Sequence, residues 1–246
     1  MKVKKSMYIK GPYRKKRNPW FLPILVVVIL LPAGVFLKGC LYRSEAKPPP
    51  KPQKKPISNH VLIIDPGHGG TDPGACREGI MEKDINLAIA KRVAKHIEGH
   101  RVRLTREKDV DFVQKGVYTR DAERQDLESR IDLAQKYHGE VFVSIHINTG
   151  EGQDSGVLVY YDPKDPASTR LAQAIQLEAN NLPDSPDKKP RPDDFYLFNN
   201  LKIPVVIVEA GWLCNPTERK RLMDPVYQEQ VANAIARGIT NFLDTL

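Results

Sequence analysis

The sequence predicts an α/β fold for residues 58–246, a single domain with a mostly parallel or mixed central sheet flanked by helices. Short apolar runs alternate with segments in which apolar residues recur every three or four positions, and this alternation of strand and helix patterns is typical of such folds. The N-terminal part lacks a globular composition, which leaves about 190 residues for the folded unit. A domain of that size can bury a substantial core.

The first elements of the domain have clear signals. Residues 60–65 (HVLIID) are a short apolar run that ends in Pro-Gly, which predicts a buried strand that leads into a loop. Residues 82–98 place Ile85 and Ile89 among apolar residues spaced three and four positions apart, and this spacing predicts a helix. Residues 101–105 (RVRLT) predict a second strand.

The alternation continues to the C-terminus. Further strands are expected at residues 140–147 (EVFVSIHI), 156–161 (GVLVYY) and 204–209 (PVVIVE), and further helices at residues 121–137, 166–181 and 225–243. In sheets of this kind, functional side chains gather beyond the carboxyl ends of the strands. An active site should therefore draw on the ends of the strands that begin at residues 60, 140 and 204.

Three polar residues fulfil that expectation, and a fourth candidate opens the first helix. His68 follows the first strand in a glycine-rich loop, His146 lies near the end of the third strand, and Glu209 closes the run VVIVE. Glu82 opens the first helix, where the helix dipole favours a carboxylate. A hydrolytic zinc keeps three protein ligands and leaves its fourth position for water, and two imidazoles with one carboxylate meet that need. A further carboxylate can then act as general base and acid.

Each of these residues also has an ordinary structural interpretation. His68 alone would be a hydrogen-bonded loop residue, His146 a core histidine, and Glu82 a first-turn helix charge. Glu209 is harder to explain in this way, because an ionised carboxylate at the end of an apolar strand is costly to bury unpaired. The spacing alone gives no compact zinc motif such as His-Glu-x-x-His.

Four ordered segments make the pattern specific. DPGHGGTDPGA, EKDINLAIAKRV, SIHIN and VVIVEAGWLCNPTE resemble the signature segments of the zinc-dependent N-acetylmuramoyl-L-alanine amidase family, in the same order and over residues 60–245. The resemblance implies that His68, Glu82 and His146 bind one zinc ion and that Glu209 is the catalytic acid/base. It further implies a single α/β domain that cleaves the amide between N-acetylmuramic acid and L-alanine in peptidoglycan.

A longer stretch resembles a narrower subgroup. LTREKDVDFVQKGVYTRDAERQDLESRIDLA is similar to the germination or spore-cortex amidases, which carry an N-terminal membrane segment. This resemblance implies a role in modifying spore-cortex peptidoglycan.

Residues 18–37 predict a transmembrane anchor. These twenty residues contain no charge, which is about the length that crosses a bilayer as a helix. The basic residues 1–17 before them predict a cytoplasmic tail. We therefore expect a single-pass protein of the bacterial cell membrane with its catalytic domain outside the cytoplasm.

Other interpretations of this segment stay open. A cleaved signal peptide would make the protein secreted, the sequence LKGC at residues 37–40 loosely resembles a lipoprotein processing site, and a buried core helix is the third choice. Residues 38–57 are rich in Pro and Lys and predict an extended linker between the membrane and the domain.

The charge distribution argues against nucleic-acid binding. The formal charge of the chain is +8, but residues 1–56 contain 14 Lys and Arg and a single acid, Glu45, and so carry +13. The rest contains 24 basic and 29 acidic residues, a net charge of −5. Domains that bind nucleic acid normally have a basic face, so this class is excluded as the main function.

The three cysteines give no disulfide framework and no Cys-x-x-Cys metal spacing. Three unpaired thiols at Cys40, Cys76 and Cys214 are the simpler interpretation. A bridge between Cys76 and Cys214 stays open, because both follow segments that are expected to converge.

Several further residues have two interpretations each. Arg130 either positions the substrate or a loop at the sheet edge, or forms an ordinary helix salt bridge. Asn148 either orients a loop or contacts substrate. The aromatic residues Phe195, Tyr196 and Phe198 either line a groove or pack inside. Four other histidines are given no role: His60, His96, His100 and His138.

Three functions are compatible with the sequence. The first is the peptidoglycan amidase. The second is a peptidoglycan-binding or regulatory protein that keeps the fold without turnover, although the retention of all four polar positions argues against it. The third is a zinc peptidase that acts on a different amide. Whether a protein partner is needed for activation stays open.

Overall fold

The structure is a computed structural model that describes residues 60–113, 119–150 and 152–246. Within these ranges, six strands form one sheet in the order β4-β1-β5-β8-β6-β7. Strands β4, β1, β5 and β8 are parallel, β6 runs antiparallel to β8, and β7 is parallel to β6, so the prediction of a mixed sheet is confirmed. The strands are β1 (Val61–Pro66), β4 (Arg101–Leu104), β5 (Val141–Asn148), β6 (Leu158–Tyr161), β7 (Arg191–Pro192) and β8 (Val205–Trp212).

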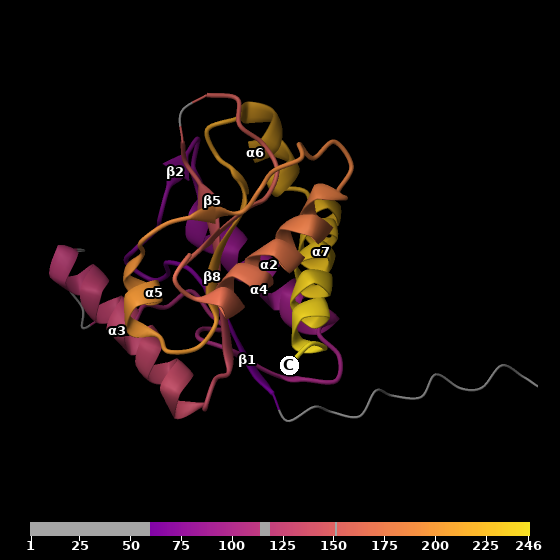
Figure 1. The fold of residues 1–246 in the computed structure, drawn as a ribbon. Helices are drawn as coiled ribbons and strands as arrows, with labels where there is room; N and C mark the ends of the chain where they lie inside the picture. Colours follow the sequence, from indigo (N-terminus) through magenta and orange to yellow (C-terminus); the bar gives the residue numbers. More distant parts are fainter. Residues whose placement is uncertain (1–59, 114–118, 151) are drawn as a thin grey trace, which may run out of the picture. The chain divides into compact units, whose positions relative to one another are not determined.

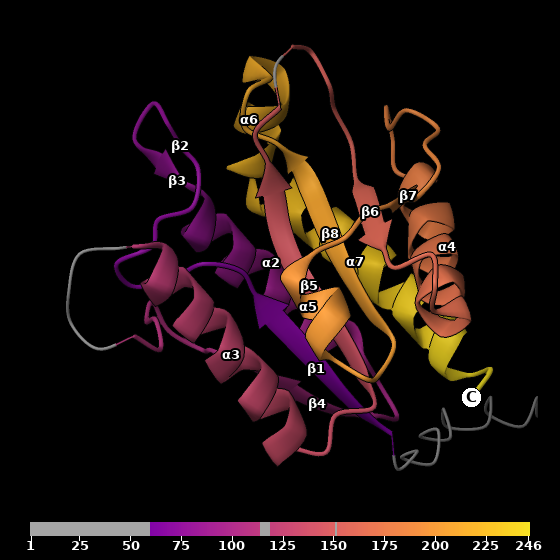
Figure 2. The ribbon, with the colours of Figure 1, turned by 60° about the vertical axis from the view of Figure 1, so that its left-hand side comes forward.

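Helices cover both faces of this sheet (Figures 1 and 2). One face packs against α2 (Glu82–His96), α4 (Pro166–Asn180) and α7 (Pro225–Leu243), and the other against α3 (Arg120–Lys136) and α5 (Tyr196–Asn200). Side chains alternate between the two layers, as the pleat of a strand requires. Leu62 and Ile64 belong to the larger core under α2, α4 and α7, whereas Val61 and Ile63 belong to the smaller core under α3 and α5.

Most predicted elements are confirmed within a few residues, but one strand is longer than expected. Strand β8 continues past Glu209 to Trp212, so the prediction that Glu209 closes the strand is wrong. The register between β5 and β8 shifts beyond His146, which marks an irregularity at this end of the sheet. The pattern also missed the short elements, namely β2 (Cys76–Arg77), β3 (Ile80–Met81), β7, α5 and α6 (Pro216–Leu222).

The predictions for the N-terminal part lie outside the described residues. This applies to the basic tail (1–17), the transmembrane segment (18–37) and the linker (38–57). None of the helices in the described ranges has the length and apolar character that a bilayer span requires. Cys76 and Cys214 are free thiols in the structure, which does not contain the bridge that the sequence left open.

Candidate metal centre

The structure brings together three of the residues that the sequence singled out. His68, Glu82 and His146 offer ligand atoms that all lie within 4.8 Å of one another. Oε1 of Glu82 lies 3.3 Å from Nε2 of His68 and 3.1 Å from Nδ1 of His146. Ligands bound tetrahedrally at about 2.0–2.1 Å are separated by roughly 3.3–3.4 Å. Two imidazoles and one carboxylate at these separations fit a divalent transition metal.

The loop after β1 positions the first imidazole. His68 has a φ of 61°, in the left-handed region that few residues other than glycine adopt. Its Nδ1 lies 2.6 Å from Oδ2 of Asp72, which leaves Nε2 to face Glu82. A partner of this kind fixes the orientation and the tautomer of a ligating histidine. Sequence reasoning missed Asp72, which stands four residues beyond His68 in the same loop.

Two glycines allow the three side chains to approach so closely. A Cβ atom at Gly67 would lie 2.2 Å from Nε2 of His146, and one at Gly74 would lie 2.7 Å from Oε2 of Glu82. Gly74 also has a φ of 65°, which favours glycine by itself. A side chain at either position would therefore displace a residue of the candidate centre.

Glu82 is held at both carboxylate oxygens. Oε2 accepts a hydrogen bond from the backbone N–H of Ala75 at 2.9 Å, and Oε1 accepts one from the N–H of Ile147 at 3.0 Å. The side-chain amide of Asn86 donates to Oε1 at 3.2 Å. Burial raises the pKa of Glu82, but the hydrogen bonds and charges of His146 and His68 lower it by a larger amount. The net shift of the pKa is therefore downward. The carboxylate is therefore ionised and preoriented.

The charges around His68 attract a cation. Burial alone would lower the pKa of His68, but the carboxylates of Asp72 and Glu82 raise it to about 10. The same negative surroundings that hold a proton on the imidazole would favour a metal ion in its place.

Glu209 lies beside this centre on the neighbouring strand. It is the register partner of His146 between the parallel strands β5 and β8, so both side chains point to the same face of the sheet. Together with His68 and Glu82 they line a cavity of about 330 Å³. Burial and the charge of Glu82 raise the pKa of Glu209 to about 8.

One oxygen of Glu209 is left without a partner. Oε2 is buried and accepts no hydrogen bond within the described part of the chain. Buried polar atoms are nearly always satisfied, so such an atom calls for an explanation. A carboxylate with a free oxygen and a pKa near neutrality, next to a cluster of metal-type ligands, has the properties of a general base.

Arg130 connects helix α3 to the loop that carries His68. Its guanidinium lies 2.6 Å from Oδ1 of Asp65 and 2.6 Å from Oδ2 of Asp126, and it donates to the carbonyl oxygens of Pro66 and His68 at 2.9 and 2.8 Å. Only 1% of the residue is exposed. Burial raises the pKa of Asp65, but Arg130 and neighbouring hydroxyls lower it more, so this carboxylate stays charged. Both interpretations of Arg130 are confirmed, because it forms a salt bridge with Asp126 within α3 and also positions the loop that carries His68.

We expect Arg130→Met to lower the free energy of unfolding by about 3–5 kcal/mol, because it leaves the buried charges of Asp65 and Asp126 without their partner. Denaturant unfolding of the variant measures this change. The matched control is Arg124→Met on the same helix, which removes an exposed pair with Glu128 and a contact with the Tyr196 ring and should have a small effect. Equal effects of the two substitutions would contradict the role given to Arg130.

The remaining sequence candidates have structural contacts. Oδ1 of Asn148 accepts a hydrogen bond from the N–H of Gly150, so this side chain orients the loop after β5, and it also lines the cavity. Phe198 belongs to the smaller core and also lines a cavity at the start of β8, and Phe195 and Tyr196 pack against that core. Nδ1 of His60 lies 2.6 Å from Oε2 of Glu140, and Nε2 of His96 lies 2.7 Å from Oε1 of Glu229.

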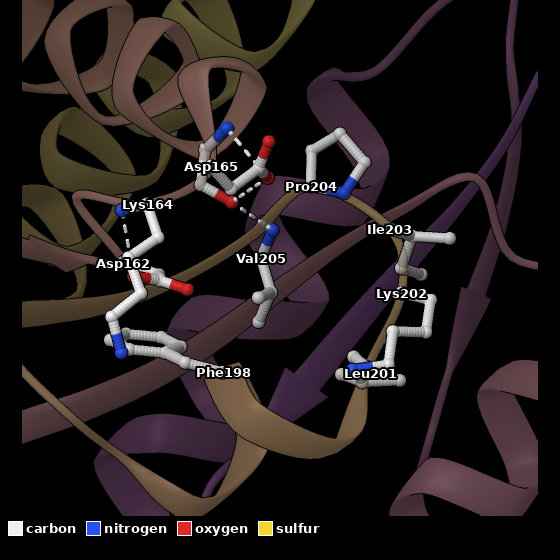
Figure 3. A pocket seen from close by; sticks show the side chains of 10 residues that line it. Asp162, Lys164, Asp165, Phe198, Leu201, Lys202, Ile203, Pro204 and Val205 are labelled. Atoms are coloured by element: carbon white, nitrogen blue, oxygen red, sulfur yellow. Dashed lines mark hydrogen bonds between the residues drawn. The ribbon is translucent and has the colours of Figure 1, made fainter.

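A further cavity of about 280 Å³ lies at the other end of the sheet, where β8 begins (Figure 3). Several of its polar groups bond to one another. The Asp165 carboxylate caps α4 and accepts from the Ser168 hydroxyl, whose oxygen in turn accepts from the N–H of Val205. This cavity is therefore explained by helix capping, and we assign it no function.

Comparisons with known proteins agree with the geometry. Residues 62–241 match the family model described as N-acetylmuramoyl-L-alanine amidase. The chain is 34% identical to the germination-specific N-acetylmuramoyl-L-alanine amidase of Bacillus subtilis, in an alignment that covers 93% of this chain and 96% of that protein.

Solved structures show the same likeness. The CwlD amidase from Clostridioides difficile, in complex with the GerS lipoprotein, is 37% identical with a TM-score of 0.70 and covers 76% of this chain and 100% of that one. The catalytic domain of CwlV, an N-acetylmuramoyl-L-alanine amidase from Bacillus (Paenibacillus) polymyxa, is 32% identical with a TM-score of 0.64 and covers 76% of this chain and 99% of that one.

Proposed function

This chain belongs to the N-acetylmuramoyl-L-alanine amidase family, and we propose that it performs the hydrolysis with a zinc ion held by His68, Glu82 and His146 and with Glu209 as the acid/base. As a peptidoglycan amidase, it cleaves the amide between N-acetylmuramic acid and L-alanine. The observation that carries the proposal is the unpartnered, buried oxygen of Glu209 beside three convergent ligand atoms.

The residues present fit a catalytic zinc site. Two imidazoles and one carboxylate are a donor set that leaves one position open, and the close packing at Gly67 and Gly74 leaves little room for a different arrangement. A zinc ion bound there supplies a Lewis acid for the scissile carbonyl and makes water more acidic. We propose one zinc ion per catalytic domain.

The protein's own residues then handle the protons. Glu209 lines the same cavity as the three ligands, so its carboxylate can take a proton from the attacking water and pass it to the departing amide nitrogen. A pKa of about 8 means that the carboxyl exchanges protons readily near neutral pH, and a cation at the ligands would favour its ionised form. Asp72 and Asn86 keep His68 and Glu82 oriented during this exchange.

We propose spore-cortex peptidoglycan as the substrate. The likeness to a germination-specific amidase over 93% of the chain supports this choice. The apolar segment at residues 18–37 supports a single-pass membrane anchor that holds the domain outside the cytoplasm, or secretion if the segment is cleaved. The solved complex of CwlD with the GerS lipoprotein supports the further proposal that this chain also acts with a protein partner.

Digestion of purified peptidoglycan tests the proposed function. We expect the full-length protein to release stem peptides that begin with L-alanine, detected by mass spectrometry, and to act faster on spore cortex than on vegetative wall. A chelator should stop the release and added zinc should restore it. Release that a chelator leaves unchanged would contradict the zinc assignment, and equal or faster digestion of the vegetative wall would contradict the cortex assignment.

A further inference from the structure

A basic pocket lies one strand away from the catalytic carboxylate. Strand β6 lies beside β8 and pairs with it (Figure 2), and by the register of this pairing Leu158 is the partner of Glu209. Directly paired residues of antiparallel strands point to the same face of a sheet. The neighbour Val159 points into the opposite core, which agrees with this orientation of Leu158. Leu158 thus extends the surface that holds Glu209 and forms the floor of a cavity of about 250 Å³.

The walls of this cavity carry a positive charge. Lys188, Lys189 and Arg191 line it together with a single acid, Asp154, and the ring of Trp212. The indole N–H of Trp212 donates to the carbonyl of Gly156 at 2.9 Å, which fixes the ring in place. The cavity therefore offers one apolar wall and an excess of cations.

The buried ammonium of Lys188 makes a cation–π contact with Trp212 but lacks a hydrogen-bond partner in the described residues. Its Nζ exposes less than 1 Å² and has no hydrogen-bond partner in the ranges that the structure describes. It lies 4.6 Å from the centre of the Trp212 ring. Burial lowers the pKa of Lys188, and the charges of Asp154 and Glu218 offset this only in part. Glu218 is itself occupied, because it accepts hydrogen bonds from Tyr227 and Gly156.

A buried ammonium without a hydrogen-bond partner favours an anionic ligand, because a charge-assisted hydrogen bond would offset the cost of its burial. The amidase substrate has anions on one side of the scissile bond only. The sugar next to the bond is uncharged once its lactyl carboxyl is amidated, whereas the stem peptide carries free carboxyl groups.

The general spacings of strands and of peptide residues would bring the residue that follows L-alanine over the pocket. Neighbouring strands lie about 4.8 Å apart, so the pocket begins about that far from Glu209. Consecutive Cα atoms lie about 3.8 Å apart, so a peptide that crosses from Glu209 to Leu158 brings its next residue over the pocket.

From these observations we propose that the pocket formed by Leu158, Lys188, Arg191 and Trp212 binds the free α-carboxylate of the second stem-peptide residue, a γ-linked glutamate. This assignment rests on the proposed function and adds a specificity-determining residue, Lys188, to it. The pocket orients the peptide side of the scissile bond, and Lys188 takes no part in the proton transfer.

The test uses two muramoyl tripeptides that differ only in this group, which is a free carboxylate in one and a carboxamide in the other. We expect the full-length protein to prefer the free acid by about tenfold or more in kcat/KM, as for a hydrogen bond to a charged group. Lys188→Met should remove this preference by raising KM for the acid with little change in kcat, and Lys188→Arg should restore part of it. Zinc content should stay unchanged in both variants.

The matched control is Lys164→Met, which removes an exposed lysine at the cavity near the other end of the sheet and should keep the preference. Calorimetric titration with the two free tripeptides gives the same comparison without turnover, and the acid should bind more tightly only when Lys188 is present. Cleavage of both substrates at equal rates by the unaltered protein, or a preference that survives in Lys188→Met, would overturn the pocket assignment while leaving the amidase chemistry intact. If the unaltered protein binds both tripeptides as expected but cleaves neither substrate, the proposed catalytic residues are wrong while the pocket assignment stands.

Discussion

Glu209→Gln is expected to lower turnover by about 10²–10⁴-fold, the contribution that a positioned general acid/base typically makes. The amide keeps the volume of the side chain but cannot accept a proton in the pH range of the enzyme. Because Glu209 lines the cavity without belonging to the three convergent ligands, the variant should keep its zinc. Turnover on peptidoglycan and metal analysis of the same preparation measure the two effects.

The control for this variant is Glu229→Gln, which alters an exposed carboxylate on α7 that pairs with Arg92 and His96. It should leave turnover unchanged. Near-normal activity of Glu209→Gln would remove Glu209 from the role of base. Loss of zinc together with activity would indicate that Glu209 acts as a ligand instead.

His146→Ala is expected to differ from Glu209→Gln in its metal content, because the protein should lose both zinc and activity. Removal of one of three ligands should weaken zinc binding by more than about 100-fold, because changes outside the ligand set alone cost up to that much. A competition titration with a zinc-binding dye measures the affinity. If His146 served only the core, its substitution would lower the stability of the protein and leave the zinc affinity unchanged.

His96→Ala is the matched control, since His96 also pairs with a carboxylate but lies on α2 away from the cavity. Its zinc affinity should equal that of the unaltered protein. Full metal occupancy of His146→Ala would exclude His146 from the ligand set, whatever the activity of the variant.

The sequence predicted those parts of the fold that have a long, regular pattern. Helix α7 has the expected bounds because Asp224 caps it, Pro225 begins it and its apolar residues keep a helical period over five turns. The central strands β1, β5 and β8 are dense runs of β-branched residues and were recognised for that reason.

Short elements escaped prediction because they have no room for a period. Strand β7 has two residues and α5 has five, so neither shows an alternation that differs from a loop. Helix α6 did leave a signal, since Asn215 caps it and Pro216 follows, and this pair could have been read as a helix start. Strand β8 extends past Glu209 because the apolar pattern resumes at Ala210 and continues to Trp212.

The residues of the candidate site could be predicted from the sequence, but the contacts that hold them in position could not. His68, His146 and Glu209 follow from the rule that side chains gather at the carboxyl ends of parallel strands, and the resemblance to a family added the role of Glu82. Contacts between distant segments were beyond this reasoning. Arg130 reaches Asp65 across 65 residues of chain.

The basic pocket shows the same limit. Lys188 belongs to a loop with no regular pattern, and only the packing against Trp212 places it beside the active-site face. From the sequence, it is one lysine among 38 basic residues. Its significance depends on the lack of a hydrogen-bond partner in the described residues, which no local sequence signal indicates.

The most direct test of the zinc-dependent mechanism is a titration of the full-length protein with zinc after the metal has been stripped by a chelator. Bound zinc and peptidoglycan turnover are measured in the same samples. If His68, Glu82 and His146 form a single catalytic metal site, turnover rises in proportion to bound zinc and stops rising at about one ion per chain. Full turnover in the stripped protein would contradict the account.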